Sequence, residues 1–193
     1  MIHIFYSFDQ FNLEKNHVAY FVNGDKLPIN NIISRITGGG STIDGEINTR
    51  EFGEANLFLI NPEGMIFGPN AQLDIGGSFY VSTANALHFG DDKIFYGDSD
   101  KPIYLSSAEP SAFGFLEGID GTININDSDL ELDEGKNLLL SSEEITVDGG
   151  SISVYGGKVS LFSSVDSKGK VTLNSEHDSS GNDQNLGSIT IKN

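Results

Sequence analysis

Apolar residues in the second half of the chain fall in pairs at positions i and i+2, with short turn sequences between them. This alternation places both members of a pair on the same face of a β-strand. Successive pairs begin 7 or 8 residues apart, which leaves no room for helices between the strands. Six pairs follow the pattern: Ile123/Ile125, Leu130/Leu132, Leu138/Leu140, Ile145/Val147, Ile152/Val154 and Val159/Leu161.

The pairs themselves repeat. Ile123 is followed 22 residues later by Ile145, and Leu130 is followed by Ile152 after the same interval. Three short strands in each turn of about 22 residues are typical of a parallel β-helix, in which every strand stacks on its counterpart one turn later. Strands at this spacing also suit an antiparallel sandwich. However, the hairpin-type Asn-Gly sequence occurs only at Asn23-Gly24, outside the periodic region, so the β-helix is favoured.

The whole chain, residues 1–193, is predicted to be a single all-β domain. Interruptions of the apolar repeat divide it into four segments. The open end of a β-helix must be covered, and the aromatic-rich residues 1–31 are predicted to be the N-terminal cap. Residues 32–83 hold the first coils, where fainter pairs recur after 22 residues. The irregular residues 84–118 are predicted to form an excursion packed on the outside of the coil. Residues 119–193 are predicted to form further coils, with a long polar loop over 174–187 and a truncated end.

The composition excludes several classes of function. The chain carries 28 acidic against 11 basic residues, a net charge of −17, so nucleic acid and anionic membrane surfaces are not expected partners. It has no cysteine, which excludes disulfides, thiolate metal sites and cysteine nucleophiles. No apolar run approaches the roughly 18 residues of a membrane span, so stable membrane insertion is not expected.

The N-terminal sequence lacks the basic and long apolar regions of a signal peptide. We therefore expect that the chain is a fragment, or that its start lies inside a longer reading frame.

No catalytic or cofactor site emerges from the sequence. The four histidines are far apart and lack ligand spacing, so no metal site is predicted. Alternation of the acidic run Asp127–Glu134 with Leu130 and Leu132 favours a solvated acidic edge over a calcium site. Enzymes on β-helices need paired carboxylates or a basic cluster in a groove, and Arg35 and Arg50 are the only arginines. We therefore predict that the protein is not an enzyme and binds no cofactor.

One turn sequence is a candidate functional motif: Asn61, Pro62, Glu63, Gly64 and Met65. Proline at the second and glycine at the fourth position favour a type I turn, and the first asparagine accepts a local main-chain hydrogen bond. The motif is therefore interpreted as a corner of the coil, as a surface recognised by a partner, or as both. On this view Asn61→Ala should cost only about 1 kcal/mol of stability.

Several segments resemble a known family in the order in which they occur. They are Ser7–Asn12, Asn31–Gly39, Ser41–Gly45, Asn61–Met65, Ile66–Gly68, Ile75–Gly77 and Val81–Asn85. The family is the secretion domain of two-partner-secreted exoproteins, the filamentous-haemagglutinin N-terminal family. Its Asn-Pro-Asn-Gly-Ile hallmark differs here at Glu63 and Met65, and Phe67–Ala71 is similar to cyanobacterial members.

The resemblance implies a right-handed parallel β-helix that acts as the secretion-targeting module of a large exoprotein. It implies recognition by the periplasmic domains of an Omp85-type outer-membrane β-barrel, and delivery through the periplasm to the medium or the cell surface. The alternative is a stand-alone adhesive or structural β-helix that binds a surface glycan through its flank. The apolar pair Ile189/Ile191 has no following cap in this sequence, so self-association through an open C-terminal coil is also predicted.

Overall fold

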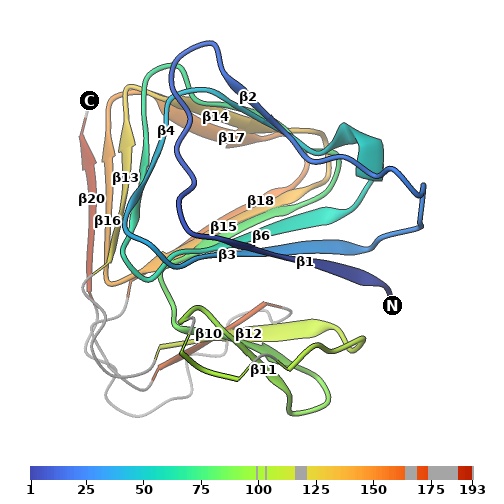
Figure 1. The fold of residues 1–193 in the computed structure, drawn as a ribbon. Coiled ribbons are helices and arrows are strands. Elements are labelled where there is room, and N and C mark those ends of the chain that lie inside the picture. The colour runs from blue at the N-terminus through green and yellow to red at the C-terminus, as the bar shows by residue number, and fades with distance from the viewer. Residues whose placement is uncertain (99, 103, 116–120, 164–168, 174–186, 193) are drawn as a thin grey trace.

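The structure is a computed structural model that describes residues 1–98, 100–102, 104–115, 121–163, 169–173 and 187–192. Within these ranges the regular structure is β apart from one 3₁₀ turn, η1 (Arg50–Phe52). Parallel strands stack into a solenoid of about six turns with a three-sided cross-section, which Figure 1 views along the stack. The parallel β-helix predicted from the apolar periodicity is confirmed.

The first side of the solenoid is a parallel sheet of six strands. Their order is the order of the coils, and the predicted pairs stack as expected: Leu57 pairs with Phe79, and Leu138 pairs with Val159. The sheet consists of β1 (His3–Phe8), β3 (Asn31–Ile36), β6 (Asn56–Ile60), β9 (Phe79–Ser82), β15 (Asn137–Ser142) and β18 (Lys158–Ser163).

The other two sides repeat the arrangement. Ile123 lies beside Ile145 and Leu130 beside Ile152, both on parallel strands, as the 22-residue period predicts. The second side holds β4 (Ser41–Ile43), β7 (Met65–Phe67), β13 (Thr122–Asn126), β16 (Glu144–Asp148) and β20 (Ser188–Lys192). The third side holds β2 (Val18–Tyr20), β5 (Glu46–Asn48) and β8 (Gln72–Asp74), and then β14 (Asp129–Leu132) and β17 (Ser151–Val154).

The inward members of each apolar pair form one continuous core along the solenoid axis. Their burial is complete in the middle coils and decreases toward the C-terminal ones, where Val159 is 40% exposed and Ile191 67% exposed. Self-association through that end stays a prediction.

The N-terminal segment both covers the solenoid and belongs to it. The rings of Tyr6, Phe8, Phe11 and Phe21 contact one another over the first coil. At the same time β1 and β2 extend two sides of the solenoid by one strand each. The aromatic cluster therefore closes the core from within the first coil.

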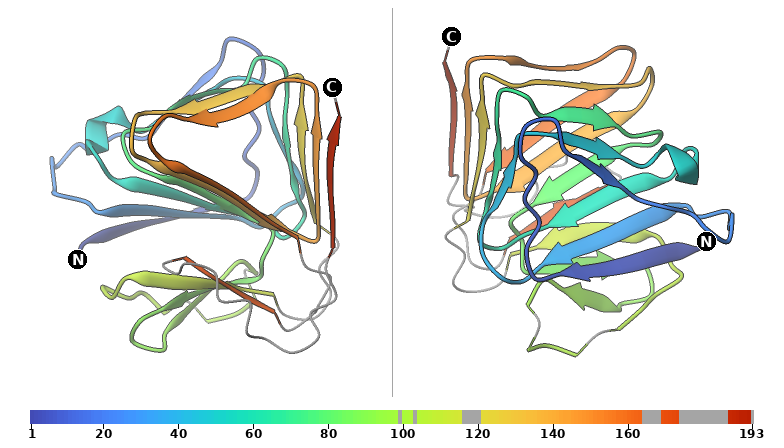
Figure 2. Two further views of the ribbon diagram at one scale, coloured as in Figure 1. Left: turned by 180° about the vertical axis from the view of Figure 1, so that it is seen from behind. Right: turned by 45° about the horizontal axis from the view of Figure 1, so that its top comes forward.

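A small antiparallel sheet lies outside the solenoid, against its first side (Figure 2). It contains β10 (Ala86–Phe89), β11 (Ile94–Tyr96), β12 (Pro110–Gly114) and β19 (Lys170–Thr172). A second apolar cluster joins it to the coil, with Leu87 and Phe113 from the outer sheet against Phe58 and Leu139 from the outer face of the first side. Full burial of each such side chain stabilises the contact by about 1.5–3 kcal/mol.

A buried arginine also links the two layers. Arg35 on β3 is 4% exposed and donates hydrogen bonds to the carbonyl oxygens of Tyr96 and Asp98, at 3.0 and 2.9 Å. Its Nε donates to the Ser7 hydroxyl at 2.9 Å, and its guanidinium lies 5.5 Å from the centre of the Phe95 ring. Arg35 thereby connects β1, β3 and the end of β11.

Two segments differ from the sequence-based division. β19 falls in the range predicted to form further coils, but it pairs with β12 at the edge of the outer sheet. The polar loop predicted over 174–187 lies outside the described residues, except for Gly187. No helix within the described ranges has the length and hydrophobicity needed to cross a bilayer.

Candidate recognition site

The motif residues 61–64 form the corner between β6 on the first side and β7 on the second. The turn is closed by a hydrogen bond from the Gly64 N–H to the Asn61 carbonyl oxygen, at 3.0 Å. The Asn61 side-chain oxygen accepts a second bond from the Glu63 N–H, also at 3.0 Å. The predicted turn and its asparagine-based hydrogen bond are both present.

The Asn61 side chain is fully buried and joins two successive coils. Its amide nitrogen donates to the Gly39 carbonyl oxygen and to the Ser41 hydroxyl, each at 3.0 Å. Its main-chain N–H donates in the other direction, to the Ser82 carbonyl oxygen at 2.9 Å. Asn61 is therefore bonded to the corresponding corners of the preceding and the following coil.

Only part of the motif is accessible to a partner. Met65 is 1% exposed and points into the core, and Gly64 is buried as well. Pro62 is half-buried, whereas Glu63 is exposed. A partner that approaches the folded domain can touch Pro62 and Glu63 but neither Asn61 nor Met65.

The same corner supports the place where the chain leaves the solenoid and returns to it. Three of the four strands of the outer sheet, β10, β11 and β12, are inserted between β9 and β13, at the corner that lies directly above the motif. Gly64 has φ of +96°, and a Cβ there would lie 2.8 Å from the Thr122 carbonyl oxygen. A Cβ on Gly121 would clash with the Pro62 carbonyl oxygen. Glycine is thus required on both sides of this contact.

Sequence reasoning missed this arrangement, since residues 61 and 121 are 60 positions apart and no periodicity connects them. The only sequence signal was the excursion itself, which was predicted to leave the coil after residue 83.

The sequence model of the TPS secretion domain matches residues 3–193, nearly the whole chain. The chain belongs to the two-partner secretion (TPS) domain family. A search of curated proteins gave no match. A TPS domain is a secretion module rather than a member of a known enzyme family, and the family implies an exported exoprotein with an outer-membrane transporter as its partner.

An ion-pair cluster lies on the third side of the TPS domain. Arg50, on η1, pairs with Asp74 at the end of β8 and with Asp133 just after β14, where its Nη2 lies 3.1 Å from Oδ1. This pairing holds the pKa of the Asp133 carboxyl below its usual value. The acidic run is therefore anchored to an earlier coil at one end, while its other carboxylates face solvent.

Arg50→Met should destabilise the domain only slightly, by up to about 1 kcal/mol at neutral pH, because all three side chains are more than a third exposed. The Asp133 carboxyl, whose pKa is lowered in the folded domain, contributes its full share of the stability above its unfolded pKa of about 4. It is lost as pH falls through the lower folded value. Urea unfolding of both proteins at pH 7 and pH 2.5 checks this, and a difference that persists unchanged at pH 2.5 would contradict it.

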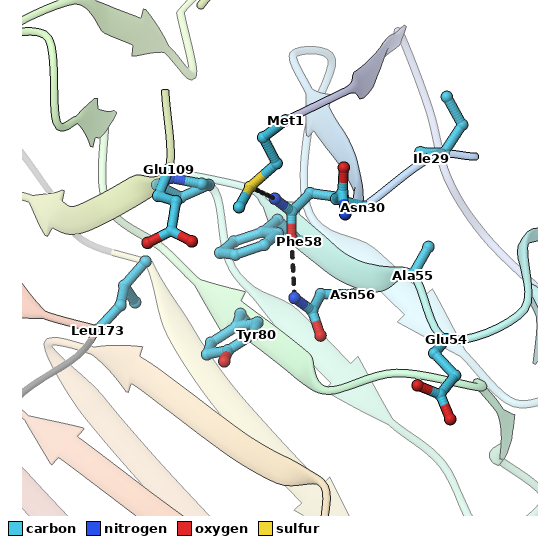
Figure 3. A pocket seen from close by; sticks show the side chains of 12 residues that line it. Met1, Ile29, Asn30, Glu54, Ala55, Asn56, Phe58, Tyr80, Glu109 and Leu173 are labelled. Atoms are coloured by element: carbon cyan, nitrogen blue, oxygen red, sulfur yellow. Dashed lines mark hydrogen bonds between the residues drawn. The ribbon is translucent and has the colours of Figure 1, made fainter. Parts of the chain in front are cut away.

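A cavity of about 340 Å³ lies between the first side and the outer sheet (Figure 3). Its amides are already engaged, since Asn56 donates to the Asn31 oxygen at 2.8 Å. The Phe58 and Tyr80 rings on its wall are stacked on each other with centroids 4.5 Å apart. Two acidic residues, Glu54 and Glu109, also line the cavity.

The histidines do not gather around a common point. His88 on β10 is partly buried, and this burial lowers its pKa. Across the described ranges, no three or more His, Cys, Asp or Glu side chains are arranged to hold a metal ion.

Proposed function

We propose that this TPS domain is the secretion-targeting module of a large exoprotein. The periplasmic domains of an Omp85-type outer-membrane barrel recognise it, and the barrel then exports the exoprotein to the medium or the cell surface, where an adhesin role is one outcome. The observation that carries the proposal is the family match over residues 3–193, together with the Asn61–Met65 corner, whose Asn61 side chain holds the preceding coil.

We further propose that the Asn61–Met65 motif serves recognition mainly through shape. Its two ends are buried, so their contribution is to fix the corner that supports the outer sheet. Any direct contact of the motif with the transporter is made by Pro62 and Glu63. The motif was predicted to be a coil corner, a recognised surface or both, and its geometry favours the first as the main role.

Export of the domain should depend on its transporter and should tolerate a change at Glu63. The chain is fused to a signal peptide and expressed in a Gram-negative host, with and without its cognate outer-membrane transporter. The parent should reach the medium only when the transporter is present. Glu63→Gln should be exported to within about twofold of the parent, because it removes one exposed charge and leaves the buried corner intact.

Lys93→Gln, a change of an exposed charged side chain on the outer sheet, is the control for loss of charge alone. Export of the parent without any transporter would argue against the secretion function. A folded Glu63→Gln protein that stays in the periplasm would instead show that the motif itself is a contact surface.

The alternative, an adhesive β-helix that binds a glycan through its flank, has one physical feature to rest on, the cavity beside Tyr80. The Phe58 and Tyr80 rings cover one face of each other and the Asn56 and Asn31 amides are paired, which leaves few groups for a sugar to bind. The secretion role is therefore preferred. The likeness of Phe67–Ala71 to cyanobacterial members stays a prediction.

A further inference from the structure

A cluster of exposed apolar side chains lies at the N-terminal end of the solenoid. Tyr20, Val22 and Leu27 are 67%, 59% and 50% exposed. Residues 22–28 form a loop. It is flanked by Phe21 and Ile29, which are buried and fix the loop to the core. Tyr20 is the last residue of β2, and Val22 and Leu27 lie in the loop that follows, which projects from the coil as the blue trace in Figure 1 shows.

This loop is braced internally. The Asn23 side chain donates to the Leu27 carbonyl oxygen at 2.9 Å and accepts from the Leu27 N–H at 3.0 Å. The Asn23 N–H donates to a Glu51 carboxylate oxygen on η1, also at 3.0 Å. Val22 and Leu27 are therefore held in the exposed position by hydrogen bonds, and little conformational entropy is lost if a partner covers them.

A free sheet edge lies next to the cluster. β2 is the terminal strand of its sheet, and its partner β5 is bonded through the His17 carbonyl oxygen and the Phe21 N–H. Main-chain groups of a parallel strand alternate in direction, so those of Val18 and Tyr20 point toward the free edge. Such an edge can accept a strand from another protein.

The charge of this region differs from that of the whole chain. Residues 18–29 contain one acid, Asp25, and one base, Lys26, and the Glu51 carboxylate lies against Asn23, so the region is only weakly acidic in a protein with a net charge of −17. Two copies of the chain would repel each other on approach, so a second copy is disfavoured at this edge. A neutral or basic partner with an apolar strand is favoured.

We infer that Tyr20, Val22 and Leu27, together with the free edge of β2, form the surface on which the transporter's periplasmic region docks. We call this surface the β2 patch. The inference rests on the proposed secretion function and specifies where recognition takes place. The partner would add an extended apolar strand beside β2, and its side chains would cover the three exposed ones.

Binding of the purified periplasmic region of the cognate transporter provides the test. Val22→Ser/Leu27→Ser should weaken binding at least about tenfold, as expected when central apolar contacts are removed. Because both side chains are at least half exposed, the melting temperature should stay within about 2 °C of the parent.

The absence of cysteine allows a second, independent readout. A bulky maleimide label on Val22→Cys should block binding. The same label on Tyr155→Cys should leave binding unchanged, since Tyr155 is 80% exposed but lies beyond β17 at the other end of the solenoid.

The outcomes separate the two proposals. If the parent binds and both the double variant and the Val22 label bind within about twofold of it, the β2 patch is not the docking surface and the secretion function stands. If the parent does not bind the periplasmic region at all, the secretion function fails and the inference fails with it.

Discussion

Replacing Asn61 by alanine is expected to destabilise the domain by about 3 kcal/mol, several times the effect of an ordinary surface change. The substitution removes the donor to Gly39 and Ser41 and the acceptor for the Glu63 N–H, all at a side chain with 0% exposure. Partners left without a hydrogen bond in the interior cannot recover one from water. The sequence alone suggested about 1 kcal/mol, because Pro62 and Gly64 would keep the turn after the side-chain acceptor is lost.

Asn70→Ala is the matched control. Asn70 also bonds the preceding coil, through the Asp44 carboxylate at 3.0 and 3.1 Å, but it is half-exposed. Its loss should cost about 1 kcal/mol. Urea unfolding measures both values, and equal costs for the two variants would contradict the role of burial. An export defect of Asn61→Ala must accordingly be compared with that of an equally unstable core variant.

Replacing Arg35 by methionine is expected to destabilise the domain by about 3 kcal/mol and to loosen the outer sheet first. Methionine keeps much of the buried volume but donates to neither the Tyr96 nor the Asp98 carbonyl oxygen. A buried charge is costly in itself, which offsets part of the loss. Since no carboxylate binds Arg35 among its described contacts, removing the charge leaves three neutral acceptors and no buried anion.

Hydrogen exchange locates the effect. In Arg35→Met, main-chain amides of β10, β11 and β12 should lose protection while those of β6 and β9 keep theirs. Arg50→Met, the same substitution at the exposed arginine, should leave the outer sheet protected. Uniform loss of protection over the whole domain would show that Arg35 stabilises the solenoid and not the junction.

The two large effects share a cause. Both side chains lie where the outer sheet meets the coil, Asn61 beneath the point where the chain leaves and returns, and Arg35 beneath β11. The hydrogen bonds of Arg35 are satisfied only when both layers are in place, whereas those of Asn61 run to neighbouring coils and fix the corner under the junction. If the transporter recognises the folded domain, recognition requires that this junction is intact.

The sequence by itself determined the solenoid and its register. The repeat from Ile123 to Ile145 and from Leu130 to Ile152 gave the strand pairs that the structure contains, because stacking of identical coils turns a spacing along the chain into a neighbour in space. The turn at Asn61 followed in the same way, since proline and glycine fix the local main chain.

Only the tertiary structure decided what surrounds these elements. The outer sheet is not part of the repeat, so nothing in the spacing showed that β19 joins it, that Pro62 faces Gly121, or that Arg35 lies beneath the end of β11. Asn61 is buried because the coils before and after it cover its side chain. Val22 is exposed because its side of the loop faces away from the core. Periodicity specifies contacts between equivalent positions, whereas contacts between the repeat and an insertion depend on where the folded chain brings them together.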